Sequence, residues 1–237
     1  MLDPNFPNRL LKAGDRRTID FIHFLSEEYS KRGLTNKTDR CVAISGLEAR
    51  IARTRRCESR YGIFEQYLHR NILWQRSEGK MKRIEYKPPM APSWSWMAYD
   101  GGIQFVDIPF GNVYWNDNLR FNDLRFNEHK YALVTDVCIF RNCGLEQRDT
   151  SYAILDSSKA ERGQIQYDVE ASEDLHAERC VVVGRESCYL HSHQSPTGKY
   201  YILVVRQTGV DGEYRRVGVG WIQSDYVARQ KLNVRVV

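Results

Sequence analysis

This 237-residue chain lacks several features that would assign it to a functional class. No stretch approaches the roughly 18 consecutive apolar residues of a membrane span, so the sequence predicts no transmembrane helix. The first residues show no basic segment followed by an apolar run, and we therefore expect no secretory signal. Together these absences predict a cytoplasmic protein without a membrane partner.

Sequence motifs of catalysis and nucleotide binding are also lacking. There is no GxSxG elbow, P-loop, HExxH or GxGxxG. Gly218 and Gly220 lie in a predicted strand that no helix follows, which favours a bulge or a close backbone approach over a nucleotide site. Asp100 stands beside two glycines, where a turn explains it better than catalysis does. We predict no catalytic residue and no cofactor.

Metal-binding patterns are weak. The six cysteines form neither CxxC pairs nor a compact disulfide scaffold, so reduced and mostly buried thiols are expected. His191 and His193 alternate in an extended segment after Cys188, a geometry that metals use. A polar loop before the turn at residues 196–198 explains both histidines, and we predict no metal ligand.

Charge is unevenly distributed. Residues 1–90 hold 19 Lys and Arg against 11 Asp and Glu, whereas the remainder holds 16 against 19. The densest basic run contains Arg50, Arg53, Arg55 and Arg56 and ends a predicted helix, where cations offset the helix dipole. We favour a solvated helix end, so nucleic acid is not the expected partner; a basic nucleic-acid-binding module remains an alternative.

The stretch from Pro88 to Trp96 is the most distinctive in the chain. Its three prolines exclude a helix or a central strand, because proline lacks an N–H and has a fixed φ. Trp94 and Trp96 then alternate with Ser93 and Ser95, which predicts a strand with one apolar face. We expect both indoles to anchor a helical part on a β-rich part, with core packing favoured over ligand stacking.

Helical periodicity predicts three helices before this stretch. The first spans residues 15–33, with Asp15 as a candidate N-cap. The second follows residues 35–39, contains Gly46, which indicates close helix packing, and is expected to bury Val42, Ala43, Ile44, Leu47 and Ile51. The third is expected over residues 63–74.

Beyond Trp96 the sequence predicts strands and turns. Residues rich in β-branched and aromatic side chains predict strands over 103–106, 131–140, 163–169, 179–183, 200–207 and 214–222. Asp211-Gly212 predicts a hairpin between the last two strands. The predicted fold class is α+β, with a helical segment at residues 1–90 packed on an antiparallel sandwich or barrel-like assembly at residues 91–237.

Several ordered blocks carry a family pattern. The first is matched at Tyr29, Ser30, Arg32, Leu34, Thr35, Asp39, Arg40, Ala43, Ser45 and Gly46. The second is matched at Tyr61, Gly62, Leu73 and Trp74. The third is matched at Ala91, Pro92, Ser93, Trp94, Ser95, Trp96, Asp100 and Gly101, and a late strand is matched at Arg216, Val217 and Gly218. They resemble the "YS-R-LT…DRL-AISG", "Y-AGLW…LLW", "APSWSW…DG" and "Y-RVG" segments of fungal heterokaryon incompatibility (HET) proteins.

The resemblance covers only the downstream half of such proteins. Their upstream HET domain, with its "Y-ALSY-WG" and "W-QE" segments, has no counterpart here, which predicts a fragment or a truncated gene product. Family membership implies a role in fungal non-self recognition and programmed cell death. The resulting hypothesis is a non-catalytic structural or interaction module whose partner is an upstream HET domain or another protein. The alternative is an enzyme of unknown reaction with a cleft between the helical and β parts, lined by Asp39, Asp100 or His191.

Overall fold

The computed structural model describes residues 9–79, 81–87, 91–122, 132–169, 171–172, 174–186 and 198–237. The chain forms two compact units, Met1–Val106 and Asp107–Val237. The first is mainly helical and the second mostly β, which confirms the α+β fold class. The division lies downstream of the expected one at residues 90 and 91, because the tryptophan segment belongs to the first unit.

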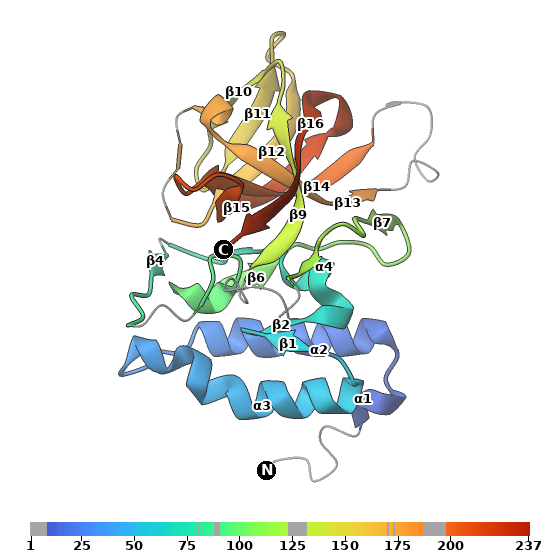
Figure 1. Ribbon diagram of the computed structural model, residues 1–237, viewed down its shortest axis with the longest axis vertical. Helices are drawn as coiled ribbons and strands as arrows, with labels where there is room; N and C mark the ends of the chain where they lie inside the picture. Colours follow the sequence, from blue (N-terminus) through green and yellow to red (C-terminus); the bar gives the residue numbers. More distant parts are fainter. Residues whose placement is uncertain are drawn as a thin grey trace. The chain divides into compact units, whose positions relative to one another are not determined.

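Two long helices dominate the first unit. Helices α2 (Asp15–Ser30) and α3 (Arg40–Arg55) lie side by side, with short α1 (Arg9–Lys12) beside α3 (Figure 1). Their shared core contains Leu10, Ile19, Ile22, Ile51, Ala52, Phe64 and Tyr67. The helix predicted at residues 15–33 is confirmed over residues 15–30, with Gly14 as the N-cap and Asp15 in the first turn.

The predicted burial along α3 is partly wrong. Ile44 and Ile51 are buried as expected, but Val42 is 63% exposed and Ala43 is exposed as well. Gly46 is also exposed, and a Cβ there would meet nothing within 4 Å. The expectation that Gly46 marks close helix packing is therefore wrong. The side of α3 that faces inward carries Arg40, Cys41 and Ile44.

The helix predicted at residues 63–74 is wrong. The segment instead contains β2 (Ile63–Phe64), the 3-10 helix η2 (Glu65–Tyr67), α4 (Leu68–Asn71) and the start of β3 (Trp74–Arg76). A tight hairpin joins β2 to β1 (Ser59–Arg60), with positive φ at Tyr61 and Gly62. The Asn71 side-chain oxygen accepts from the Phe64 N–H at 3.2 Å, which holds α4 against this hairpin.

The strand predicted at Trp94–Trp96 is also wrong. Residues 93–95 form turns, followed by the 3-10 helix η3 (Trp96–Ala98). Strand β5 (Tyr99–Asp100) then pairs with β4 (Lys82–Arg83), and β6 (Ile103–Phe105) pairs with β3. The Ser95 side chain accepts from the Met97 N–H and caps η3, so the serine favours a helical turn over a strand.

The second unit contains a closed five-stranded barrel. Its strands are β9 (Leu133–Phe140), β13 (Arg179–Glu186), β14 (Lys199–Gln207), β15 (Glu213–Gln223) and β16 (Val227–Val236). Each pairs antiparallel with the next, except that a short parallel pairing of β15 with β16 closes the ring.

Further strands extend the barrel. An antiparallel ribbon of β10 (Cys143–Gln147), β11 (Tyr152–Asp156) and β12 (Glu161–Tyr167) joins the barrel at β15 (Figure 1). Short β7 (Val113–Trp115) pairs with β13, and β8 (Arg120–Phe121) pairs with β9. The structure also contains the 3-10 helices η1 (Lys37–Asp39) in the first unit and η4 (Leu175–Ala177) and η6 (Ser224–Tyr226) in the second.

Several sequence predictions for this unit are confirmed. The strands expected over residues 179–183, 200–207 and 214–222 are present, and Asp211-Gly212 lies in the β14–β15 hairpin. The strands expected over residues 131–140 and 163–169 are confirmed over residues 133–140 and 163–167. Gly218 makes the predicted close approach, since a Cβ there would lie 2.7 Å from the Gln166 carbonyl oxygen. Strand β16 was not expected, because its register shifts beside Lys231 break the alternation of apolar and polar residues.

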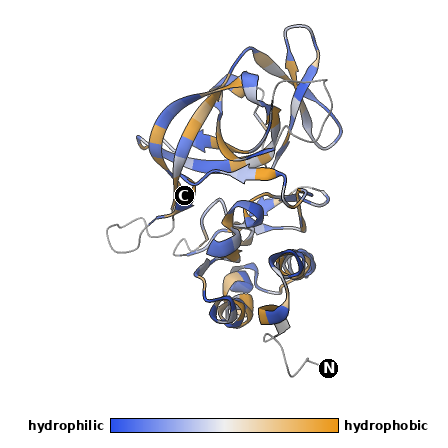
Figure 2. Cartoon of the chain, turned by 90° about the vertical axis from the view of Figure 1, so that its right-hand side faces the viewer, coloured by the Kyte–Doolittle hydropathy of each residue, from blue (hydrophilic) through white to orange (hydrophobic). Residues whose placement is uncertain are grey.

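Hydrophobic and hydrophilic residues alternate along the barrel strands (Figure 2). The apolar positions build a core that includes Cys138, Phe140, Ile165, Cys180, Ile202 and Val204. Among the described residues, no helix has both the length and the apolar character needed to cross a membrane.

Candidate functional site

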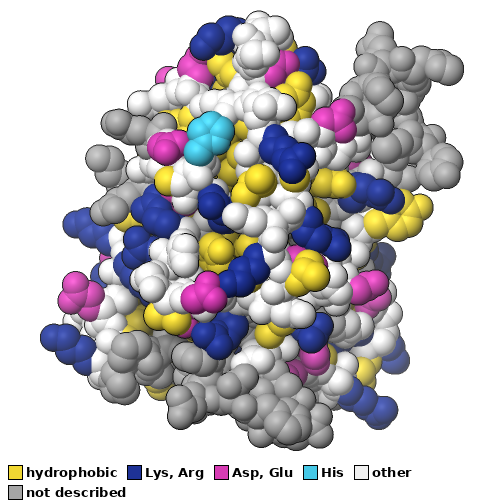
Figure 3. Space-filling model, turned by 45° about the horizontal axis from the view of Figure 1, so that its top comes forward, with side chains coloured by type: hydrophobic (Ala, Val, Ile, Leu, Met, Phe, Trp, Pro, Cys, Tyr) yellow, Lys and Arg dark blue, Asp and Glu magenta, His cyan; other side chains and the backbone are white. Residues whose placement is uncertain are grey.

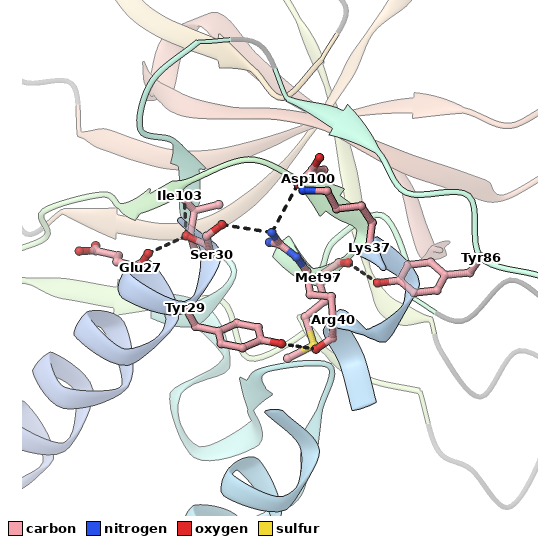
Figure 4. Close-up of polar contacts among 9 residues, drawn as sticks. All are labelled: Glu27, Tyr29, Ser30, Lys37, Arg40, Tyr86, Met97, Asp100 and Ile103. Atoms are coloured by element: carbon pink, nitrogen blue, oxygen red, sulfur yellow. Dashed lines mark hydrogen bonds and ion pairs between the residues drawn. The ribbon is translucent and has the colours of Figure 1, made fainter. Parts of the chain in front are cut away.

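Residues of the first and third family-like blocks meet around Arg40 in the first unit (Figure 4). Arg40 begins α3, and its side chain is only 1% exposed. Its Nη2 donates to the Ser30 carbonyl oxygen at 3.1 Å, and its own carbonyl accepts from the Tyr29 hydroxyl at 3.0 Å. The same Nη2 lies 3.8 Å from Asp100 Oδ1. The buried guanidinium therefore joins three segments of the chain.

The electrostatics of this cluster are unusual for a surface ion pair. Burial lowers the pKa of Arg40 from its ordinary value, while the nearby Asp100 carboxylate opposes that shift. Asp100 is itself about one-third exposed and also accepts from Lys37 Nζ at 3.0 Å. The Arg40 guanidinium carbon lies 6.0 Å from the centre of the Trp96 ring, which adds a cation–π contact. Within the described part of the chain, Arg40 Nε and Nη1 have no hydrogen-bond partner.

The end of α2 is tied to β6 by side chains. Ser30 Oγ donates to the Glu27 carbonyl oxygen at 2.7 Å and accepts from the Ile103 N–H at 2.9 Å. Glu27 Oε1 accepts from the Phe105 N–H at 2.9 Å. Ser30 is buried, so its hydroxyl satisfies a backbone donor that would otherwise be unpaired.

A second polar chain involves Cys41 and Tyr86. The Cys41 thiol donates to the Tyr86 oxygen at 3.4 Å, and the Tyr86 hydroxyl donates to the Met97 carbonyl oxygen at 2.8 Å. Burial raises the pKa of the Cys41 thiol, and burial together with the Cys41 contact raises the pKa of Tyr86. Both groups therefore stay protonated near neutral pH and are poor nucleophiles.

The tryptophans of the second and third blocks are fully buried. Trp74 Nε1 donates to the Trp94 carbonyl oxygen at 2.9 Å, and the ring of Trp94 meets the edge of Tyr61 at 6.3 Å. Trp96 meets Tyr29 in a similar edge contact at 6.0 Å. The prediction that the indoles pack in a core is confirmed. The contacts described here join elements within the first unit.

Gly62 is required by this packing. Its φ is +78°, and a Cβ there would lie 2.8 Å from Trp96 Nε1 and 2.9 Å from Met97 Cε. Its N–H donates to Glu48 Oε1 at 3.0 Å, and burial raises the pKa of Glu48. The second family-like block thus supplies a turn that only glycine fits against the tryptophan of the third block.

Acid is expected to destabilise the first unit through His23. Its ring stacks on Phe105 with centroids 3.7 Å apart, and its Nε2 lies 3.3 Å from Asn71 Nδ2. Burial, with a smaller contribution from Arg70, lowers the pKa of His23 from 6.5 to about 3. Because the unfolded state then binds more protons, stability present above pH 6.5 is lost as the pH falls toward the folded-state pKa.

A fall from pH 6.5 to 5 is expected to reduce the free energy of unfolding by about 2 kcal/mol. Urea denaturation at the two pH values measures this change. His23→Gln removes the titrating group, so its stability should vary less over the same interval. An equal pH dependence in the variant would contradict this assignment.

Asp39 and Asp100, two residues of the predicted enzyme alternative, have different hydrogen-bond partners. Asp39 is exposed and accepts from Asn36 Nδ2 at 3.1 Å, whereas Asp100 pairs with Lys37. His191, together with Cys188 and His193, lies outside the described residues. The described ranges contain no group of three or more His, Cys, Asp or Glu arranged to hold a metal ion.

The basic run predicted at the end of a helix does end α3. Arg56 is its left-handed C-cap. Arg55 is held by Asp15 at 2.7 Å and by the Leu10 carbonyl oxygen at 3.1 Å, while Arg50 and Arg53 are exposed. On the face shown in Figure 3, Lys and Arg are interspersed with acidic and hydrophobic side chains. The prediction that this run ends a helix is confirmed.

The remaining family-like residues divide by exposure. Buried ones are Gly62, Leu73, Ala91, Pro92, Ser93 and Ser95 in the first unit and Arg216, Val217 and Gly218 in the second. Partly buried ones are Leu34 and Gly101, and exposed ones are Arg32, Thr35, Asp39, Ala43, Ser45 and Gly46.

Sequence reasoning missed several partners of these residues. Lys37, Glu48 and Tyr86 each contact a residue within a family-like block. Asp168 forms a bidentate ion pair with buried Arg216. The only available signal was the residue type, since a buried arginine requires an acceptor. No local pattern in the sequence indicates where along the chain the partner of such a residue lies.

The chain was also compared with known proteins. No protein-family model, no curated protein and no solved structure matches it.

Proposed function

We propose that this chain is an interaction module of a heterokaryon-incompatibility-type protein and acts in fungal non-self recognition without catalysing a reaction. The observation that supports the proposal is the division of the family-like residues into two groups. The buried group, including Ser30, Arg40 and Trp96, is engaged in contacts that hold the first unit together. An exposed group on α3 contributes little to that packing and is available to a partner.

The exposed group gives the proposed partner surface a definite location. Val42 and Ala43 lie four and three residues before Gly46, so all three share one side of α3. Val42 is 63% exposed, and the space around Gly46 is open. A helix surface with small and apolar side chains allows another protein to approach closely. The proposed partner is the HET domain that precedes these blocks in family proteins.

The test measures binding of the purified chain to a purified HET domain from a fungal protein whose downstream half carries the same blocks. Gly46→Arg places a long charged side chain on the proposed surface and is expected to weaken binding at least tenfold without lowering the melting temperature. Asp20→Arg, an exposed position on α2, introduces the same side chain elsewhere and should bind like the unaltered chain.

Two outcomes would contradict the proposal. One is the absence of binding by the unaltered, folded chain; the other is equal binding by the unaltered chain and Gly46→Arg. A separate assay expresses the chain alone in the cytoplasm of a filamentous fungus, where no cell death is expected. Death caused by the isolated chain would argue that the chain itself is an effector.

A further inference from the structure

The second unit holds three buried thiols whose positions the proposed function does not require. Cys138 lies on β9, Cys143 on β10 and Cys180 on β13, and all three belong to one hydrophobic core. Each is a free cysteine in the structure. Cys138 and Cys180 are paired across two strands, whereas Cys143 has a different partner.

Cys138 and Cys180 lie directly opposite each other in the antiparallel pairing of β9 with β13. Opposed residues in such a pair have Cα atoms about 4.5–5.5 Å apart, within the roughly 4.4–6.8 Å that a disulfide spans. Cys143 instead lies opposite Asp156 in the β10–β11 pairing.

The two thiols of the pair differ in their surroundings. Cys138 is 9% exposed and lies opposite Arg229 of β16, whereas Cys180 is fully buried. The neighbouring Cys180 thiol and the charge of Arg229 lower the pKa of Cys138, against the opposing effects of burial and Asp136. The neighbouring Cys138 sulfur, together with burial, raises the pKa of Cys180. Cys138 is thus suited to react first, as a thiolate, and Cys180 to react second, as a thiol.

We propose that Cys138 and Cys180 form a peroxide-sensitive dithiol that closes to a disulfide across β9 and β13. The Cys138 thiolate attacks one oxygen of hydrogen peroxide, the O–O bond breaks, and the departing hydroxide takes up a proton to become water. The Cys180 sulfur then attacks the Cys138 sulfenic acid, the S–O bond breaks, and a second water leaves with the Cys180 proton. Both sulfurs are oxidised, and one peroxide is reduced.

The test treats the reduced, folded chain with hydrogen peroxide, blocks the remaining thiols under denaturing conditions and maps the linked peptides by mass spectrometry. The expected result is loss of the mass of two hydrogen atoms and a Cys138–Cys180 link. Retention of all free thiols, or a link that involves Cys143 or Cys188 instead, would overturn the proposal. Because the unaltered chain decides this result, it does not depend on the folding of a variant.

Variants assign the two roles. In Cys180→Ser the reaction should stop at the Cys138 sulfenic acid, which dimedone traps, and in Cys138→Ser no link and no trapped Cys180 should form. Cys143→Ser, a matched substitution in the same core, should form the link as the unaltered chain does. Arg229→Leu should slow the reaction with peroxide several-fold. Trapping of Cys180 in place of Cys138 would reverse the assignment.

Discussion

Replacement of Trp94 with alanine is expected to lower the free energy of unfolding of the first unit by about 3–5 kcal/mol. The side chain is fully buried and meets the ring of Tyr61, so its removal leaves a cavity that the surrounding segments fill only in part. The Trp94 carbonyl that accepts from Trp74 Nε1 remains in the variant, so the loss reports on packing of the indole. Urea denaturation monitored by near-ultraviolet circular dichroism measures this change.

The matched control for this substitution is Phe24→Ala. Phe24 is also aromatic and lies in the same unit, but its side chain is 63% exposed. Its replacement is expected to change stability by no more than about 0.5 kcal/mol. Similar unfolding curves for Trp94→Ala and the unaltered chain would show that the indole does not contribute to the core.

A comparable loss, about 3–5 kcal/mol, is expected for Asp168→Ala in the second unit. Asp168 accepts from Arg216 Nε at 3.0 Å and from Arg216 Nη2 at 3.1 Å, and both side chains are almost completely buried. Removal of the carboxylate leaves a buried guanidinium without its charge partner. Urea denaturation followed through a probe in the barrel strands measures the effect.

Two controls separate charge burial from loss of side-chain volume. Asp168→Leu combined with Arg216→Met removes both charges and should recover most of the stability, because a buried ion pair is often replaceable by apolar groups. Glu146→Ala breaks the exposed ion pair with Arg148 and should cost less than about 1 kcal/mol. If Asp168→Ala lowered the free energy of unfolding as little as Glu146→Ala does, the buried ion pair would not stabilise the second unit.

The Arg40 cluster shows how far local sequence reasoning reaches. The sequence predicted that Tyr29 lies in one helix and that the next helix starts after residue 39, and both predictions are correct. It did not predict that Arg40 is buried or that Asp100 approaches it, because a charged residue at a helix start is normally solvated. Burial of this arginine depends on η3 and β5, which come from a distant part of the chain.

Patterns read within a few residues determined much of this protein. Apolar periodicity placed α2, β-branched runs placed most barrel strands, Asp211-Gly212 placed a hairpin, and the size of the indoles indicated their burial. Each of these features depends on contacts or conformations of residues that are close together in the sequence.

Tertiary structure alone decided the rest. It turned the tryptophan segment into turns and a 3-10 helix, opposed Cys138 to Cys180, and joined Asp168 to Arg216 across 48 positions. It also closed the barrel through β16, whose shifted register hides the alternation that marks a strand. These features depend on which distant segments meet, and a buried charge, a paired thiol or an irregular strand acquires its partner only when they do.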